Sequence, residues 1–237
     1  MGSVITGQII NFIKDYNAIE PGDVLGVGVS GGKDSMVLLH ALADIRNYLE
    51  IPFELKAFTV SLGFDGFDLG PVENICKTIN VPYEIIHTNI GAVVFDARKE
   101  SNPCSLCANM RRGALNNAAK AAGCNKVVLG HNKDDVIETF LMSLFYEGRL
   151  NTFSPITYLS KKDLHVIRPL SYSYDKDVRY YRNLFELPTV KNPCPVSGVT
   201  GRESIREFIK KQGRGNKHFR ANIFGAIKRN NISGWKD

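Results

Sequence analysis

The sequence predicts an α/β fold, a parallel five-stranded sheet with helices on both faces. Apolar runs of strand length alternate along the chain with longer runs of helical character. Successive parallel strands need a crossover connection about as long as these helical runs. Right-handed crossovers of this kind place helices on both faces of the sheet, so the pattern predicts one layered α/β unit.

The elements are expected in the following order. An amphipathic helix near residues 4–17 comes first. The strands are expected at 24–29, 53–60, 82–86, 126–130 and 166–170. The helices that follow them are expected near 35–49, 70–80, 105–122, 134–147 and 175–186. Gly123 is placed to end the fourth of these helices, because glycine is the usual residue after a helix C-terminus.

The chain is expected to divide into residues 1–190, which hold the sheet, and residues 191–237. The second part begins with an irregular Pro/Gly-rich connection and continues as two small helices, 202–213 and 217–230. Residues 202–237 carry ten Lys/Arg and three Asp/Glu, whereas the whole chain of 237 residues has a net charge of only +6. This clustering predicts a partner with a phosphate backbone; the alternative is a solvated helical surface.

Composition restricts the class of protein. No apolar run approaches the roughly 20 residues that span a bilayer, and no signal sequence opens the chain, so we expect a cytoplasmic protein without a membrane partner. The five cysteines are an odd number, which argues against a disulfide framework. Cys76 and Cys124 have apolar neighbours and are expected in the core.

The most informative motif follows the first strand and opens a helix. It consists of Val29, Ser30, Gly31, Gly32, Lys33, Asp34 and Ser35. Glycines allow close backbone approach, and the free N–H groups of a helix start attract an anion. The spacing is not that of a Walker loop, and it resembles the pyrophosphate loop (PP-loop) of enzymes that split ATP between its α and β phosphates. The alternative is a glycine-rich turn without function.

Ligands of such sheets bind at the carboxyl ends of the strands, which adds two segments to the site. The first comprises Thr59, Val60 and Ser61, and the second runs from Gly130 to Asp135. Of the paired acids in the second segment, Asp134 is expected to cap a helix, and Asp135 is expected to hold Mg²⁺ near a triphosphate.

Three cysteines form a third feature. Cys104 and Cys107 make a CxxC pair at a helix start, where the helix dipole lowers thiol pKa values, and Cys194 lies in a late loop that could return to the same edge. Three thiolates without a fourth protein ligand fit an iron–sulfur cluster with one open iron. One alternative is a zinc site of three thiolates completed by His131. The other is that Cys194 is an unrelated loop thiol.

The motifs together resemble one family. SGGKDS, PCSLCxxxRR, LGHNxDD, IRPL and a late PC occur in the order typical of the TtcA family of tRNA 2-thiocytidine synthetases and the related TtuA-type sulfurtransferases, over about residues 20–230. The resemblance implies an adenine nucleotide α-hydrolase-like PP-loop fold, with residues 1–190 as the ATP pyrophosphatase domain. It also implies an ATP-dependent sulfurtransferase that adenylates a tRNA pyrimidine carbonyl, C2 of a cytidine above all, and replaces the oxygen by sulfur.

The same resemblance implies the roles of individual residues. A [4Fe–4S] cluster would be held by Cys104, Cys107 and Cys194, and the catalytic residues would be Asp34, Arg111 and Asp135. ATP would contact the PP-loop together with Thr59, Val60, Ser61, Gly130 and Asp135, with Mg²⁺ bound. Separately from the resemblance, the basic clustering in residues 202–237 leads us to expect contacts to tRNA from Arg202, Arg206, Lys210 and Arg220. The implied sulfur donor is a cysteine desulfurase persulfide or free sulfide, and the implied assembly is a homodimer.

The sequence departs from the family pattern at two places, and several alternative functions stay open. Ser197 stands where many relatives have a further cysteine, and Asn132-Lys133 replace a His-Arg pair, which leaves the nucleoside open. The alternatives are thiolation or sulfur removal on another nucleobase or a small molecule, an amide- or lysidine-forming ligase that needs no cysteines, and a regulatory module that binds nucleotide and metal without catalysis.

Overall fold

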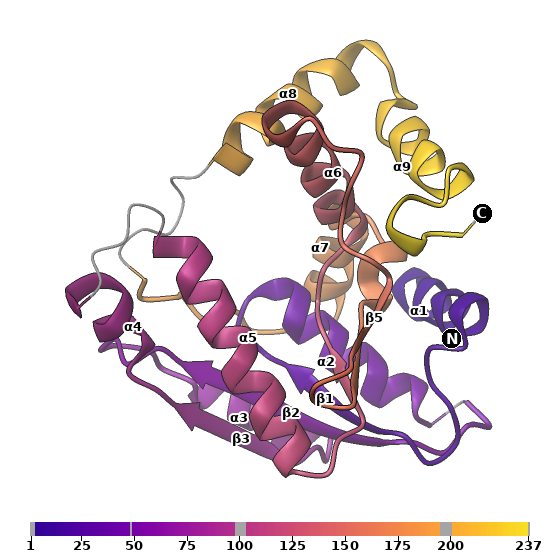
Figure 1. Ribbon diagram of the computed structural model, residues 1–237. Helices are drawn as coiled ribbons and strands as arrows, with labels where there is room; N and C mark the ends of the chain where they lie inside the picture. The colour runs from indigo at the N-terminus through magenta and orange to yellow at the C-terminus, as the bar shows by residue number, and fades with distance from the viewer. Residues whose placement is uncertain (1–2, 48, 98–102, 195–200, 237) are drawn as a thin grey trace.

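The computed structural model describes residues 3–47, 49–97, 103–194 and 201–236 (Figure 1). Its centre is a six-stranded sheet in the order β3-β2-β1-β4-β6-β5. The strands are β1 (Val24–Gly28), β2 (Glu54–Ser61), β3 (Tyr83–His87), β4 (Lys126–Val128), β5 (Ile156–Leu159) and β6 (Leu164–Ile167).

The predicted α/β class is confirmed, but the strand count of five is wrong. All pairs of neighbouring strands are parallel except β5 and β6, which form an antiparallel hairpin at the edge of the sheet. The strand missed by the sequence pattern is β5. It has a single neighbour, and most of its residues are only partly buried, so it lacks the continuous apolar run of the inner strands.

The helices begin and end within a few residues of their predicted positions. They are α1 (Val4–Tyr16), α2 (Lys33–Ile45), α3 (Gly70–Thr78), α5 (Pro103–Ala121), α6 (Lys133–Glu147), α7 (Asp175–Leu184), α8 (Gly201–Gly215) and α9 (Phe219–Arg229). A short helix α4 (Ile90–Ala92), which continues as a π-helical turn (Val93–Ala97), was not predicted. α8 also continues through the expected break at Gly213 and ends at Gly215.

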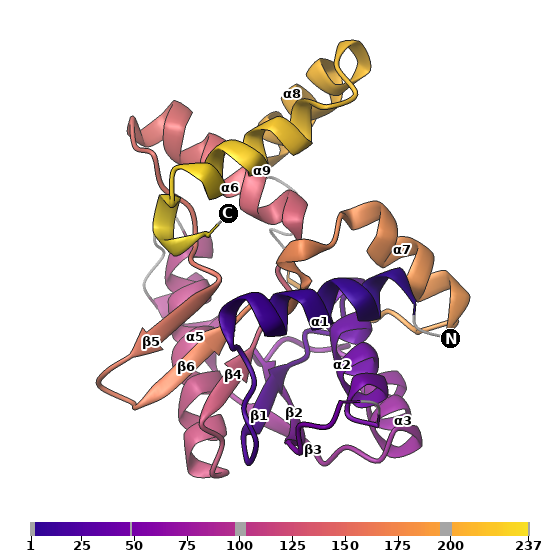
Figure 2. The same ribbon diagram turned by 90° about the vertical axis from the view of Figure 1, so that its right-hand side faces the viewer.

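Helices cover both faces of the sheet. On one face α1, α2, α3 and α7 bury the largest apolar cluster, which includes Leu25, Leu38 and Leu42. On the other face Leu115 and Ala119 of α5 pack against strand side chains, and Cys124 joins this cluster. Figure 2 shows α1 and α2 on one side of the strands and α5 on the other. Cys76 and Cys124 are both buried, as expected.

A separate apolar cluster joins α6 to the C-terminal helices. Val136, Ile137, Ile209 and Ile227 are buried there around Trp235. Figure 1 shows α8 and α9 beside α6 and away from the strands. The C-terminal helices therefore pack on a helix that belongs to the first of the two predicted parts, and the boundary near residue 190 stays a prediction. No helix among the described residues is both long and apolar enough to span a membrane.

Candidate active site

Hydrogen bonds within the loop between β1 and α2 hold it in a shape that can accept an anion. Ser35 Oγ accepts a hydrogen bond of 3.1 Å from the N–H of Ser30 and donates one of 2.9 Å to the carbonyl oxygen of Gly32. Gly32 begins the helix without a side-chain cap, so the N–H groups of the first turn remain available to a ligand. Gly31 has a φ of +77°, which side chains rarely tolerate.

The loop after β4 approaches this helix start closely. A Cβ atom at Gly130 would lie 3.1 Å from the backbone nitrogen of Ser35, a distance that requires one of the two segments to move. A side chain at this position would therefore press the two loops apart by a few tenths of an ångström. The contact brings the predicted segments 30–35 and 130–135 together at the carboxyl ends of neighbouring strands.

Asn132 links the acids of the two loops. Its side-chain nitrogen donates a 2.9 Å hydrogen bond to Asp34 Oδ1, and its side-chain oxygen accepts from the N–H of Asp135, 3.1 Å away. Asp135 accepts in return from the N–H of Asn132 at 3.0 Å, which completes a capping box at the start of α6. Burial raises the pKa of Asp135, an effect opposed by the Asn132 hydrogen bond.

Lys33 lies between two carboxylates. Its ammonium is 2.7 Å from Asp34 Oδ2 and 2.6 Å from Asp175 Oδ1 at the start of α7. Burial disfavours the charged form of Lys33, but the two carboxylates outweigh this effect and raise its pKa. Lys33 is therefore a permanent cation at physiological pH. Asp175 was not predicted at the site, because it lies about 140 residues from Lys33 and belongs to no recognisable motif.

Two cavities meet at these acids. The first, the loop pocket, has a volume of about 230 Å³ and is lined by Val29, Ser30, Gly32, Asp34, Ser35, Val60, Arg111, Gly130 and His131, among others. The second, the tail cavity, has a volume of about 770 Å³ and lies between the acids and the C-terminal helices. Asp34 lines both, whereas Lys33 and Asp135 line only the tail cavity.

Thr59 and Ser61, although predicted at the site, do not line either cavity. The Thr59 hydroxyl is buried, donates to the carbonyl oxygen of Val29 at 2.6 Å and accepts from Tyr83 Oη at 2.9 Å. The carbonyl oxygen of Ser61 accepts from Thr88 Oγ1 at 2.7 Å. These residues hold the strand ends in place, and Val60 between them faces the loop pocket.

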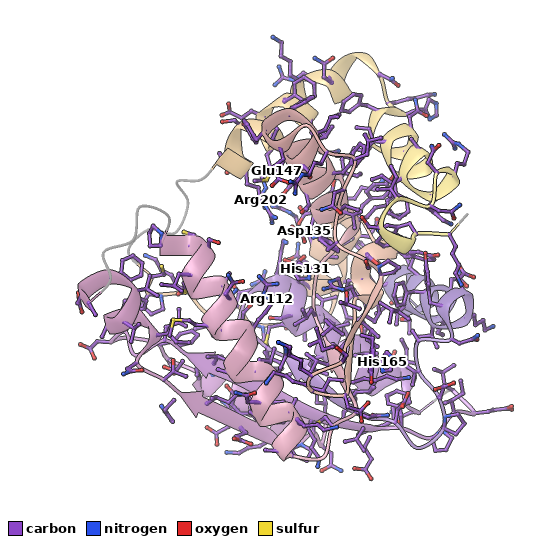
Figure 3. All side chains as sticks on the ribbon, in the orientation of Figure 1. Arg112, His131, Asp135, Glu147, His165 and Arg202 are labelled. Atoms are coloured by element: carbon purple, nitrogen blue, oxygen red, sulfur yellow. The ribbon has the colours of Figure 1, made fainter. Side chains whose placement is uncertain are left out.

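His131 is a neutral group in a cationic environment. Burial, reinforced by Arg168, Arg202, Arg112 and Arg111, lowers its pKa to about 3. Its Nδ1 is buried without a hydrogen-bond partner among the described residues, and its ring lies 4.9 Å from the Phe153 ring. The sequence pattern suggested His131 only as a zinc ligand, whereas in the structure it lines the loop pocket. Figure 3 labels His131 and Asp135.

The cysteines lie on two segments that approach each other. Cys104 and Cys107 occupy the first turns of α5, and Cys107 packs against the apolar side chains around Leu62 and Val94. Burial raises the pKa of the Cys107 thiol; the Arg111 charge lowers it, and Cys194 and Cys104 raise it. These electrostatic effects require all three thiols and Arg111 to lie in the same neighbourhood.

The segment before Cys194 is attached to the PP-loop. The N–H of Val190 donates a 2.8 Å hydrogen bond to the carbonyl oxygen of Gly31. Asn192 and Pro193 line a small cavity together with Arg111. Residues 195–200, which include Ser197, lie outside the described residues.

The donor set of the predicted metal site consists of three thiols. All three thiols are free, and Cys104 is exposed. Among the described residues, no group of three His, Cys, Asp or Glu side chains forms a ready site for one metal ion. Cysteines that hold a cluster each bind a different iron, so their sulfur atoms need not converge on one point. A Mg²⁺ site needs few protein ligands, because the ion is commonly bound by one or two carboxylates together with substrate phosphates.

Three of the four cations predicted to contact RNA are paired with acids of α6. Arg202 Nη1 lies 3.3 Å from Asp135 Oδ1, Arg206 Nε 2.8 Å from Glu138 Oε1, and Arg220 Nε 3.0 Å from Asp134 Oδ1. Lys210 lines the tail cavity and has no ion pair within the described part of the chain. These ion pairs attach α8 and α9 to the start of α6 beside the PP-loop.

The strand–loop–helix anion site, the second acidic loop and the parallel sheet define a nucleotide-binding α/β protein of the PP-loop class. A family model described as a PP-loop domain matches residues 2–212. The chain is 34% identical to the tRNA-cytidine(32) 2-sulfurtransferase of Pelobacter propionicus, over 91% of this chain and 81% of that protein. It is also 34% identical to the enzyme of that name from Syntrophotalea carbinolica, over 94% and 86% of the two chains. The chain therefore belongs to the PP-loop family, in its TtcA/TtuA-type sulfurtransferase branch.

Solved structures agree on the fold. One of them is the U34-tRNA thiolase NcsA from Methanococcus maripaludis, solved with its [4Fe-4S] cluster, which superposes with a TM-score of 0.78 at 23% identity. The superposition covers 95% of this chain and 76% of the NcsA chain. An NH3-dependent NAD synthetase from Campylobacter jejuni has a TM-score of 0.54 at 18% identity, covering 95% and 90% of the two chains. At these identities both show the fold alone.

Proposed function

We propose that this protein uses ATP to thiolate a tRNA pyrimidine, at C2 of a cytidine, by adenylation of the carbonyl oxygen followed by sulfur transfer. Relatives that match over most of their length are tRNA-cytidine(32) 2-sulfurtransferases, which supports the substrate. The observation that carries the proposal is the attachment of the Cys194 segment to the PP-loop through Val190 and Gly31. This attachment supports a single site for sulfur chemistry and nucleotide chemistry.

Activation makes the carbonyl oxygen a leaving group. The oxygen attacks the α phosphorus of ATP, a new P–O bond forms, and pyrophosphate leaves with the electrons of the broken bond. The first-turn N–H groups of α2 and the Lys33 ammonium would stabilise the charge that gathers on pyrophosphate. Asp34 and Asp135, linked through Asn132, would hold Mg²⁺. Arg111, which lines the loop pocket, would neutralise the α phosphate.

Substitution completes the reaction. A hydrosulfide adds to the activated carbon, AMP departs with the original oxygen, and one proton is released. Cys104, Cys107 and Cys194 would hold a [4Fe–4S] cluster, whose open iron supplies a site for the sulfur nucleophile. The apolar side chains around Cys107 would exclude water from this position. A persulfide from a cysteine desulfurase or free sulfide as donor, a homodimeric assembly and a cytoplasmic location stay predictions.

Nucleoside analysis tests the function. Anaerobically prepared protein with reconstituted cluster is incubated with tRNA, ATP, Mg²⁺ and sulfide, and the digested tRNA is examined by mass spectrometry for 2-thiocytidine. We expect 2-thiocytidine and one AMP per thiolated base, both lost in Cys194→Ala. Cys76→Ala is the matched control, because burial raises the pKa of the Cys76 thiol to about 11 and removes it from this chemistry. AMP release with no thiolated nucleoside, unaffected by Cys194→Ala, would favour a ligase and contradict the proposal.

A further inference from the structure

A third cavity, the hairpin cavity, lies between α5 and the β5–β6 hairpin and has a volume of about 500 Å³. It takes no part in the chemistry derived above. It adjoins the loop pocket, because Leu115 and Leu129 line both cavities. Two consecutive residues of α5 divide between them: Arg111 lines the loop pocket and Arg112 the hairpin cavity. Figure 3 shows Arg112 on α5 near His131.

The hairpin cavity is lined by positively charged side chains. Of the described residues, four cations and no carboxylate line it; the cations are Arg112, Lys161, Lys162 and Arg168. None of the four has an ion pair within the described ranges. Asp163, the one acid of the hairpin, is engaged elsewhere, by Lys120 at 3.4 Å and by the Tyr158 hydroxyl at 3.1 Å. The tail cavity differs, since its arginines and Lys33 are paired with acids.

Arg168 is a buried cation that a bound anion would stabilise. It is buried, and only its Nη1 donates hydrogen bonds to described residues, to the carbonyl oxygen of Ser154 at 2.7 Å and to Thr157 Oγ1 at 3.2 Å. Its Nε is buried and has no hydrogen-bond partner among the residues that the structure describes. Burial, reinforced by the Arg112 charge, lowers the pKa of Arg168 to about 10, and the two guanidinium groups repel each other. A bound anion would relieve this repulsion.

The cavity also has a surface suited to a nucleoside. Tyr158 lines it and is 53% exposed; its ring packs 4.8 Å from the His165 ring, and its exposed part is open to stacking. Leu115, Leu129 and Val166 supply an apolar floor. An RNA nucleotide that enters the loop pocket brings flanking phosphates with it, and these must pass close to the shared wall.

We infer that the hairpin cavity binds the phosphodiester backbone of the RNA substrate next to the reacting nucleotide, with Arg112, Lys161 and Lys162 as the phosphate contacts. This inference rests on the proposed function and extends it, because it places the main RNA contact on the edge hairpin rather than on the paired arginines of the C-terminal helices. Lys161 and Lys162 lie in the turn of the hairpin, where substitution leaves the sheet intact.

Binding of tRNA to the protein without ATP tests the inference apart from catalysis. The double variant Lys161→Gln/Lys162→Gln is compared with Lys14→Gln/Lys77→Gln, which removes the same charge from α1 and α3 on the opposite face of the sheet. Filter binding over a range of salt concentrations gives the affinity and its salt dependence. We expect about a tenfold loss of tRNA affinity in the hairpin variant and a shallower salt dependence by about 1.5 in log–log slope. The control should match the unaltered protein.

ATP affinity and thermal stability show whether the hairpin variant is folded; both should be unchanged. Arg112→Gln tests the same cavity from α5 and should weaken tRNA binding to a similar degree. Unchanged tRNA affinity and salt slope in both variants, in a protein that still forms 2-thiocytidine, would overturn the inference and leave the proposed function standing. Loss of ATP or inorganic phosphate binding with unchanged tRNA affinity would overturn it too, and assign the cavity to a small anion. An unaltered protein that neither binds nor thiolates tRNA would instead refute the proposed function.

Discussion

The backbone N–H of Val190 lies 2.8 Å from the carbonyl oxygen of Gly31 and donates a hydrogen bond to it. A Cβ atom at Gly31 would lie 2.9 Å from the Cβ of Val190, and the φ of Gly31 is +77°. Glycine is thus required here both for the backbone conformation and for close packing of the two segments. The contact couples the PP-loop to the segment that carries Cys194, so a disturbance of either should reach both.

Gly31→Ala should therefore impair cluster retention as well as ATP binding. Gly22→Ala is a matched control, because Gly22 also has a positive φ, +86°, but an added Cβ meets nothing within 4 Å. Gly22→Ala should lose about 1–2 kcal/mol of stability through the strained backbone, and Gly31→Ala should lose more, because its added Cβ also meets Val190. Only Gly31→Ala should lose iron and ATP affinity, measured by iron analysis and calorimetry. Equal iron content in the two variants would contradict the coupling.

Asn132→Ala should reduce activity more than its effect on stability explains. The substitution removes the cap of α6, which costs about 1 kcal/mol, and also the hydrogen bond that orients Asp34. Ser3→Ala removes the corresponding capping box of α1, far from the site, and serves as the control. We expect similar losses in melting temperature and at least a tenfold loss of AMP formation in Asn132→Ala alone. Equal activities would show that the link to Asp34 is unimportant.

His131 should make the protein sensitive to acid. Its pKa in the folded state is about 3, below the value of about 6.5 in an unfolded chain. Between these values the unfolded state binds more protons, so the stability falls as the pH decreases from about 6.5 towards 3, by at most about 1.4 kcal/mol per pH unit. His131→Gln should flatten this dependence in denaturant titrations, whereas substitution of the exposed His87 by Gln should not. A profile unchanged by His131→Gln would refute the assignment.

Trp235→Ala should loosen the C-terminal helices from α6. The indole is fully buried, packs 5.3 Å from the Phe224 ring and donates a 3.0 Å hydrogen bond from Nε1 to the carbonyl oxygen of Phe153. We expect a loss of about 3–5 kcal/mol in chemical denaturation. Tyr180→Ala, which truncates an aromatic side chain that is 69% exposed, should change the stability little. A cost below 1 kcal/mol for Trp235→Ala would mean that the cluster around it contributes little to the fold.

The fold was predictable from the sequence where local signals are strong. The inner strands are apolar on both sides, and their helices begin and end at recognisable residues, such as Asn132 and Gly123. The pattern failed at β5, an edge strand whose residues are partly exposed. It also failed at the short helical turn after β3, which is too brief to show a period.

The candidate site was predictable to the extent that its residues are neighbours in the sequence. The PP-loop and the Gly130–Asp135 loop are continuous motifs, and the topology of a parallel sheet brings them together. Pairings over long separations had no local signal. The contacts of Lys33 with Asp175 and of Arg202 with Asp135 depend on how whole helices pack, which no motif encodes. The hairpin cavity was not predicted either, because β5, which forms part of its wall, was not predicted.

Cys104, Cys107 and Cys194 are proposed to hold one iron–sulfur cluster beside the PP-loop. Iron, acid-labile sulfide and zinc are to be measured in anaerobically purified protein, in Cys194→Ala and in the buried-thiol control Cys76→Ala. We predict about four irons and four sulfides per chain in the unaltered protein and the control, and their loss in Cys194→Ala. One zinc per chain, or full iron content in Cys194→Ala, would contradict the account.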